Sequence, residues 1–159
     1  EIYKSVKKKN HNVEFSSDFI IGHPGEMDCD FKDTMNLVKE IKFINSYSFI
    51  YSPRPGTPAS KLEAVDKEVA KDRLINIQKA LENHQLKKNE SLLGTSVEVL
   101  VEKKLKNQKK YFGRNAFLNS VIFEGKKEHI GKLLRVKIEK TNRNTLFGKI
   151  DENNNMRAA

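Results

Sequence analysis

The strongest constraint on the fold is the stretch of residues 48–59, SFIYSPRPGTPA, where an apolar run ends in three of the chain's four prolines. Proline fixes φ, lacks a backbone N–H donor and pushes the preceding residue into an extended conformation. A strand can therefore continue only to about Ser52, and an irregular loop carrying Arg54 must follow it. In α/β sheets ligands bind beyond this carboxyl edge of the strands. The alternative is a surface loop that only blocks a helix.

A second strand is expected before this stretch. Residues 19–21 form a short apolar run with high β propensity, and Gly22 and Gly25 follow it directly. We expect a helix after this glycine turn, capped by Asp28 or Asp30. Its apolar face consists of Phe31, Met35, Val38 and Ile41. Strand, turn, helix and strand form a βαβ unit with parallel strands, so the two turns should line one edge of the sheet.

Two further helices are expected in the first part of the chain. Residues 1–10 are polar and lysine-rich and predict the last turns of a helix. A longer helix should begin after Asp66, a good N-cap, and run to about residue 91, a length of ~35–40 Å at 1.5 Å per residue. Its apolar positions are Val69, Leu74, Ile77 and Leu81.

From Thr95 onward the hydrophobic period changes from helical to alternating, which predicts five short strands punctuated by glycine and asparagine. Five such strands suggest a small closed barrel of OB-like size. We expect Phe123 and Phe147 to fill its core, and Tyr111, Phe112 and Phe117 to lie near its surface.

The charge is distributed unevenly along the chain. Lys and Arg equal Asp and Glu in residues 1–100, with 15 of each, but number 15 against 6 in residues 101–159. This excess accounts for the whole net charge of +9 and predicts a polyanion as partner of the last third, with nucleic acid as the first candidate. The sequence shows neither an apolar run near ~20 residues nor a signal-peptide pattern, so we expect a cytoplasmic protein without a membrane partner.

Two ordered motifs, SDFIIGHPGE at 17–26 and the proline stretch at 48–59, together resemble the late core of the radical-SAM tRNA methylthiotransferases. They are most similar to the branch that methylthiolates isopentenyl-adenosine beside the anticodon. Arg54 favours the tRNA-modifying branches over the ribosomal-protein branch, whereas His23 departs from the phenylalanine usual in the family. The last third resembles the RNA-binding TRAM domain at Leu93-Gly94, 98–102, Gly113-Arg114, Gly131-Lys132 and 146–148.

The resemblance implies a fold of α/β followed by all-β. Residues 1–65 would be the end of a partial radical-SAM (β/α) barrel, and residues 66–92 a long connecting helix. Residues 93–152 would be a small five-stranded OB-like TRAM barrel, and residues 153–159 a disordered tail. The implied cofactors of the full-length family are S-adenosylmethionine and 4Fe-4S clusters, and the implied partner is tRNA at its anticodon region.

The resemblance also implies roles for individual residues. The strand and glycine turn would run beside the adenosyl group of S-adenosylmethionine, which makes the expected cofactor-binding residues Ile20, Gly22 and Glu26. Glu26 has the alternative of holding the turn. The expected RNA-binding residues are Arg54, Lys109, Lys110, Arg114, Asn115 and Lys132. Arg54 has the alternative of anchoring its own loop, and Arg114 and Asn115 that of building a β-turn or the barrel rim.

The sequence lacks the residues that would hold an iron–sulfur cluster. A radical-SAM enzyme needs a CxxxCxxC loop, and the family carries a second three-cysteine cluster, but Cys29 is the only cysteine. The four histidines show no paired ligand spacing, so we assign neither a metal site nor a catalytic residue. We expect a C-terminal fragment that is inactive alone. An N-terminal part would complete it, either on the same polypeptide or as a separate complementary chain. The alternatives are a free-standing RNA-binding TRAM protein with a catalytically dead remnant, and a pseudogene product that does not fold.

Overall fold

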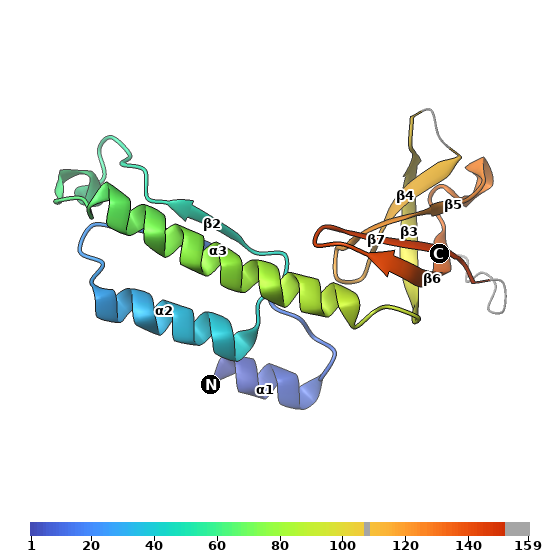
Figure 1. Cartoon of the computed structure of the whole chain (residues 1–159), viewed down its shortest axis with the longest axis horizontal. Helices are drawn as coiled ribbons and strands as arrows, with labels where there is room; N and C mark the ends of the chain where they lie inside the picture. Colours follow the sequence, from blue (N-terminus) through green and yellow to red (C-terminus); the bar gives the residue numbers. More distant parts are fainter. Residues whose placement is uncertain (107–108, 152–159) are drawn as a thin grey trace. The chain divides into compact units, whose positions relative to one another are not determined.

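The computed structural model describes residues 1–106 and 109–151, and Figure 1 labels its α-helices and most of its strands. The chain divides into two units, Glu1–His84 and Gln85–Ala159, and the boundary falls inside helix α3 (Lys67–Glu90). The tail expected at residues 153–159 lies outside the described residues.

The first unit contains the expected βαβ arrangement. Its elements are α1 (Ile2–Lys9), β1 (Asp18–Ile21), α2 (Asp28–Ile41), β2 (Tyr47–Ile50), the short 3-10 helix η1 (Pro58–Lys61) and most of α3. Strands β1 and β2 pair in parallel, with Ile20 opposite Phe49 and Ile21 opposite Ile50. The parallel pairing confirms the prediction that the turns after both strands lie at one edge. In its described residues this unit has a two-stranded sheet rather than a barrel.

The two faces of this small sheet have opposite surroundings. Phe19 and Ile21 point into a buried cluster with residues from the helices, namely Val38 and Phe43 from α2 and the segment after it, and Ile77 and Leu81 from α3. The expected α2 face packs here as well, since Phe31, Met35 and Ile41 lie against the same cluster. The other face of the sheet is open: Ile20, Tyr47 and Phe49 are 60%, 66% and 55% exposed.

Helix caps in the first unit agree with the sequence in one case and differ in the other. Asp66 caps α3 as predicted, because its Oδ1 accepts hydrogen bonds from the Glu68 and Val69 amides at 2.9 and 3.1 Å. The prediction for α2 is wrong in position: its N-cap is Met27. Asp30 acts from the first turn, where its carboxylate accepts the Met27 N–H at 2.8 Å. Because α2 begins at Asp28, Asp30 is the third residue of the helix, and from this position its side chain reaches back to the N-cap Met27.

The second unit is a closed five-stranded barrel, as predicted. Its strands are β3 (Ser96–Lys104), β4 (Lys110–Asn115), β5 (Ser120–Glu124), β6 (Leu133–Thr141) and β7 (Thr145–Ile150), with the 3-10 helix η2 (Lys127–His129) before β6. They close in the order β3-β4-β5-β7-β6, and β5 pairs with β7 in parallel. No helix in the described part of the chain is both long and apolar enough to cross a membrane.

Two aromatic residues of the barrel face the opposite way to the prediction. Tyr111, expected near the surface, is 4% exposed and belongs to the core with Phe123. Phe147, expected in the core, is half-buried, and its neighbour Leu146 is the fully buried residue. Because adjacent strand residues point to opposite faces, one residue of each such pair must face outward. Phe112 and Phe117 are also half-buried.

Candidate functional site

The turn after β1 is closed by one carboxylate. Gly22 and Gly25 both have positive φ, at 72° and 89°. The Gly22 amide donates a hydrogen bond to Oε2 of Glu26 at 3.0 Å, and the Glu26 amide donates to the carbonyl of His23 at 2.9 Å. A Cβ on Gly22 would lie 2.8 Å from the Cβ of Ala70, so glycine is needed here for α3 to approach the turn.

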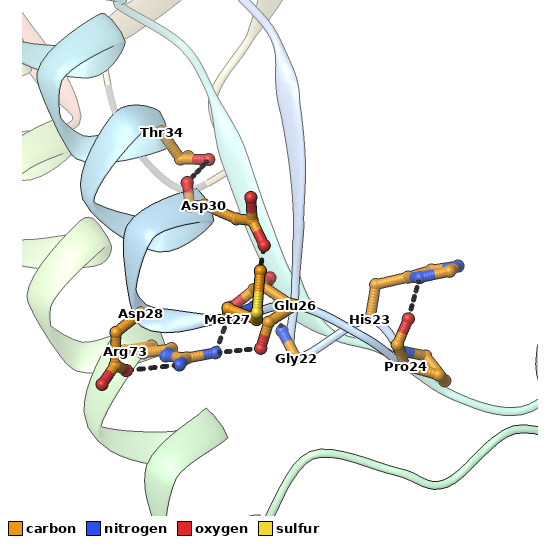
Figure 2. Close-up of polar contacts among 9 residues, drawn as sticks. All are labelled: Gly22, His23, Pro24, Glu26, Met27, Asp28, Asp30, Thr34 and Arg73. Atoms are coloured by element: carbon orange, nitrogen blue, oxygen red, sulfur yellow. Dashed lines mark hydrogen bonds and ion pairs between the residues drawn. The ribbon is translucent and has the colours of Figure 1, made fainter.

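An arginine of α3 fixes the same turn from the other side. Arg73 donates from Nη1 to Oε1 of Glu26 at 2.7 Å and from Nη2 to Oδ1 of Asp28 at 2.6 Å, as Figure 2 shows. Its side chain is 8% exposed and that of Glu26 13%. Burial by itself lowers the pKa of Arg73. The hydrogen bonds and charges of Asp28 and Glu26 outweigh burial, so the pKa is raised and the guanidinium stays charged.

The proline loop meets the glycine turn at the edge of the sheet. The Tyr51 amide donates to the Ile21 carbonyl at 2.8 Å, and the Tyr51 and His23 rings meet edge to face at 5.0 Å between centroids. His23 bonds the Pro24 carbonyl through Nδ1 at 3.0 Å, which is drawn in Figure 2. Arg54 has an exposed side chain, and its carbonyl accepts the Thr57 hydroxyl at 2.8 Å. The two turns therefore form one surface.

The three residues expected to bind S-adenosylmethionine have different surroundings. Ile20 is open on the exposed face of the sheet, where an apolar side chain is available to a ligand such as adenine. Gly22 is buried against Ala70, and both carboxylate oxygens of Glu26 are engaged by Gly22 and Arg73. Gly22 and Glu26 thus hold the turn, the role that the sequence left open for Glu26, while Ile20 faces outward.

The donor set of this chain does not fit an iron–sulfur cluster. Cys29 is exposed in the first turn of α2 and is the only thiol that the sequence provides. Among the described residues, His, Cys, Asp and Glu side chains nowhere gather in a group of three that could hold a metal ion. Cluster ligation needs several thiolates, so this chain alone supplies too few.

The outer surface of the barrel carries cations around an aromatic ring. Phe112 lies on β4 between Lys103 Nζ and Arg114 Cζ, at 5.3 and 5.4 Å from its ring centroid. Arg114, 48% exposed, also donates to Oε1 of Glu102 at 2.9 Å. Lys110 is exposed two residues before Phe112, so β4 presents cation, ring and cation in alternation. Such a face combines phosphate attraction with a surface for base stacking.

The remaining residues expected at an RNA interface differ in exposure. Lys109 and Lys132 are exposed on segments that flank β3, and the Lys132 carbonyl accepts the Val101 amide at 3.0 Å. Asn115 is 5% exposed, and its Oδ1 accepts the amides of Phe117 and Asn119 at 3.0 Å each. Asn115 therefore closes the β4–β5 turn and offers little surface to a ligand. Arg54 belongs to the first unit.

Asn89, which the sequence analysis did not single out, anchors the end of α3 within the second unit. It is fully buried, and its Nδ2 donates to the carbonyls of Asn142 and Arg143 at 2.9 Å each. Its Oδ1 accepts from Asn119 Nδ2 at 2.8 Å and from Gln85 Nε2 at 3.0 Å. These bonds use the full capacity of an asparagine side chain.

A sequence signal for Arg73 and Asn89 exists. Arg73 lies four residues before the buried Ile77, and Asn89 lies eight residues after the buried Leu81. A polar residue on the apolar face of a helix needs a partner when it is buried. The sequence pattern predicts the apolar face of α3, but it does not single out Arg73 and Asn89 as polar residues that need a buried partner.

Comparison with known proteins identifies the barrel. Residues 90–150 match the sequence model of the TRAM domain family. The second unit contains a TRAM domain. This match begins at Glu90, next to Asn89, and ends with β7, so it covers the whole TRAM barrel.

The similarity to known proteins extends beyond the TRAM domain to nearly the whole chain. The chain is 52% identical over 158 residues to a tRNA-2-methylthio-N(6)-dimethylallyladenosine synthase of Pelagibacter ubique, covering 99% of this chain and 35% of that protein. Proteins of the same name from Buchnera aphidicola and Wolbachia pipientis wMel are 42% and 39% identical, over 97% and 93% of this chain. The chain matches the C-terminal part of these relatives and spans about a third of their length.

Proposed function

We propose that this chain is the C-terminal part of a tRNA methylthiotransferase, the enzyme that methylthiolates C2 of isopentenyl-adenosine next to the anticodon. The observation that carries the proposal is the 52% identity to a synthase of that name across 99% of the chain. The similarity includes the first unit as well as the TRAM domain, so it is not explained by a widespread RNA-binding module alone. Because the chain spans 35% of that relative, most of the enzyme lies outside it.

Each unit then has its own task. Residues 1–65 are the end of the radical-SAM domain, residues 66–92 the connecting helix, and residues 93–152 the RNA-binding part. In the first unit, Ile20 contacts the adenosyl group of S-adenosylmethionine, while Gly22 and Glu26 shape the turn beside it. The open, apolar side chain of Ile20 and the fully bonded Glu26 support this division.

The TRAM domain binds the anticodon region of tRNA, a cytoplasmic partner. The excess of cations in residues 101–159 supports an electrostatic contribution, to which Lys109, Lys110, Arg114 and Lys132 contribute from the barrel. Arg54 adds a cation from the first unit, where its exposed side chain is free to meet a phosphate or a carboxylate. Asn115 contributes indirectly by fixing the turn between β4 and β5.

The redox chemistry belongs to the rest of the enzyme. An iron–sulfur cluster, which would supply the electron for cleavage of S-adenosylmethionine, would need thiolates from residues outside this chain, since Cys29 stands alone. That part can belong to the same polypeptide or to a complementary chain. The 159-residue chain by itself should bind tRNA without modifying it.

Two assays on the purified 159-residue chain test this proposal. The first measures binding to a tRNA anticodon stem-loop by electrophoretic mobility shift at increasing salt, and we expect affinity that falls steeply with salt. The second measures cleavage of S-adenosylmethionine after anaerobic iron–sulfur reconstitution, and we expect none. Failure to bind at low salt would refute the RNA-binding role, and cleavage without a second chain would refute the division of labour.

A further inference from the structure

One end of the TRAM barrel is assembled around Asn89. The Asn89 Nδ2 donates to the carbonyls of Asn142 and Arg143 in the β6–β7 hairpin at 2.9 Å each. Its Oδ1 accepts from Asn119, at the end of the β4–β5 turn, at 2.8 Å. A single buried side chain therefore ties the hairpin tip and the turn to the last turn of α3. The three segments, here called the Asn89 end, are residues 85–90, 115–120 and 141–145.

The β4–β5 turn presents Leu118 to solvent. Leu118 is 69% exposed and has φ of 60°, in the left-handed region, which is costly for leucine. The turn is nevertheless fixed, because the Leu118 amide donates to the Asn115 carbonyl at 2.9 Å. The Asn115 side chain accepts the two amides that flank Leu118. The fold thus holds an apolar side chain outward with backbone strain, a combination that points to a contact residue.

The aromatic ring beside Leu118 is already covered. Phe117 is half-buried, and the ammonium of Lys88 lies 4.4 Å from its ring centroid. Leu118 is therefore the large apolar side chain that this turn exposes to a partner.

The charge of the Asn89 end favours an anionic partner. Its three segments hold Lys87, Lys88 and Arg143 against the single carboxylate of Glu90. Lys87 and Arg143 are exposed, and the bond to Asn89 fixes the backbone of Arg143. A nucleic acid offers phosphates to such cations and base faces to an apolar side chain, whereas an apolar protein surface offers only the second.

We infer that the Asn89 end is a second RNA contact of the TRAM domain, in which Leu118 inserts between two bases of a loop. Lys87 and Arg143 hold the adjoining phosphates. The inference rests on the RNA-binding function proposed above. Leucine is one of the side chains that proteins insert as a wedge into nucleic acid, where it partly unstacks a base step. Unstacking costs least where bases are unpaired, so the wedge selects a loop over a duplex.

The test uses the full 159-residue chain and anticodon stem-loops that each carry 2-aminopurine at one loop position. Stacking on neighbouring bases quenches this probe, and the chain has no tryptophan, so the probe can be excited selectively. We expect its fluorescence to rise at one loop position when the chain binds, because Leu118 separates the probe from its neighbour.

Two variants divide the apolar contact from the ionic one. Leu118→Asn should abolish the fluorescence rise and weaken binding about tenfold, with the salt dependence of binding unchanged. Arg143→Gln should instead reduce the slope of log K against log salt by about 0.7–0.9.

Asparagine at position 118 also separates a binding role from a structural one. Asparagine adopts the left-handed backbone more readily than leucine, so Leu118→Asn should keep or raise the stability measured by urea unfolding. Leu118→Met keeps an apolar side chain and should retain both the affinity and the fluorescence rise. Ile2→Asn is the matched control, because Ile2 is 80% exposed in α1 of the first unit.

The outcomes distinguish this inference from the function on which it rests. A chain that binds the stem-loops without a fluorescence rise at any loop position would overturn the wedge and leave RNA binding intact. The same holds if Leu118→Asn binds as tightly as the unchanged chain, or if the loop annealed to its complement binds equally well. A chain that binds neither RNA form at low salt would overturn both proposals.

Discussion

Gly22 packs so closely against Ala70 that a Cβ at position 22 would lie 2.8 Å from the Ala70 Cβ. The glycine also has φ of 72°, in the left-handed region. Replacement by alanine adds backbone strain to overpacking. We expect Gly22→Ala to destabilise the first unit by about 2–4 kcal/mol, measured by urea unfolding.

Gly25→Ala is the matched control for this prediction. Gly25 also has positive φ, 89°, but a Cβ there meets no described atom within 4 Å. Only backbone strain should remain, at about 1–2 kcal/mol. Equal losses for both variants would show that the approach of α3 to the turn does not depend on Gly22.

Arg73→Met should remove the bond between α3 and the glycine turn. The Glu26 carboxylate would then remain 13% exposed without its cation, and breaking a buried pair in this way costs about 3–5 kcal/mol. The control is Lys71→Met, since Lys71 and Glu68 form an exposed pair whose loss should cost at most about 1 kcal/mol. Urea unfolding of the two variants measures both values. A loss for Arg73→Met no larger than that of the control would contradict the assigned role.

The raised pKa of Arg73 gives this contribution a pH dependence with a definite sign. A raised native pKa stabilises the fold at every pH below the unfolded pKa, and that stabilisation is lost only as the pH rises through the native value. Arginine titrates far above neutral pH. Titration of Arg73 should therefore leave one quantity unchanged from neutral pH to about pH 10. This quantity is the difference in unfolding free energy between the unchanged chain and Arg73→Met.

Asn89→Ala should destabilise the TRAM domain. The substitution leaves the carbonyls of Asn142 and Arg143 and the amide of Asn119 without their buried partner. Each unsatisfied group costs about 1–3 kcal/mol, so a total of about 3 kcal/mol or more is expected. Asn83→Ala, at an exposed position of the same helix, should change stability by less than about 0.5 kcal/mol. Urea unfolding measures the loss, and hydrogen–deuterium exchange of peptides from β3 to β7 would show whether it falls on this unit.

Neutralising the cations of β4 should change the salt dependence of RNA binding. Lys110→Gln and Arg114→Gln should each weaken binding and reduce the slope of log K against log salt by about 0.7–0.9, the value for one phosphate contact. Lys61→Gln is the control, since Lys61 lies in η1 of the first unit. Filter binding at several salt concentrations measures the slopes. An unchanged slope for Lys110→Gln would remove that lysine from the interface.

Most elements of this fold follow from hydrophobic periodicity, because burial of one face is what selects helix or strand. The alternation of Val99 and Val101 and the spacing of Met35 and Val38 predicted their elements, and all four lie in or against a core. Neighbouring apolar residues are harder to assign. For Leu146 and Phe147 the sequence does not determine which faces inward, since that depends on how the barrel closes.

The polar residues that hold the elements together were the least predictable. Arg73 and Glu26 are 47 positions apart, and Asn89 and Asn142 are 53 apart. Periodicity identifies the face on which a residue lies, but not a partner from a distant segment. For Glu26 and Asn115 the sequence left two roles open, binding a ligand and holding a turn. The hydrogen bonds of both residues correspond to holding a turn.

The hydrogen bonds of Asn89 also decide where the barrel can be cut from the rest of the protein. A fragment starting at residue 93, the boundary drawn from sequence, would discard the side chain that ties the β6–β7 hairpin to the β4–β5 turn. A fragment starting before Gln85 keeps it. The last turn of a helix that looks like a linker is therefore an integral part of the smallest piece expected to fold on its own.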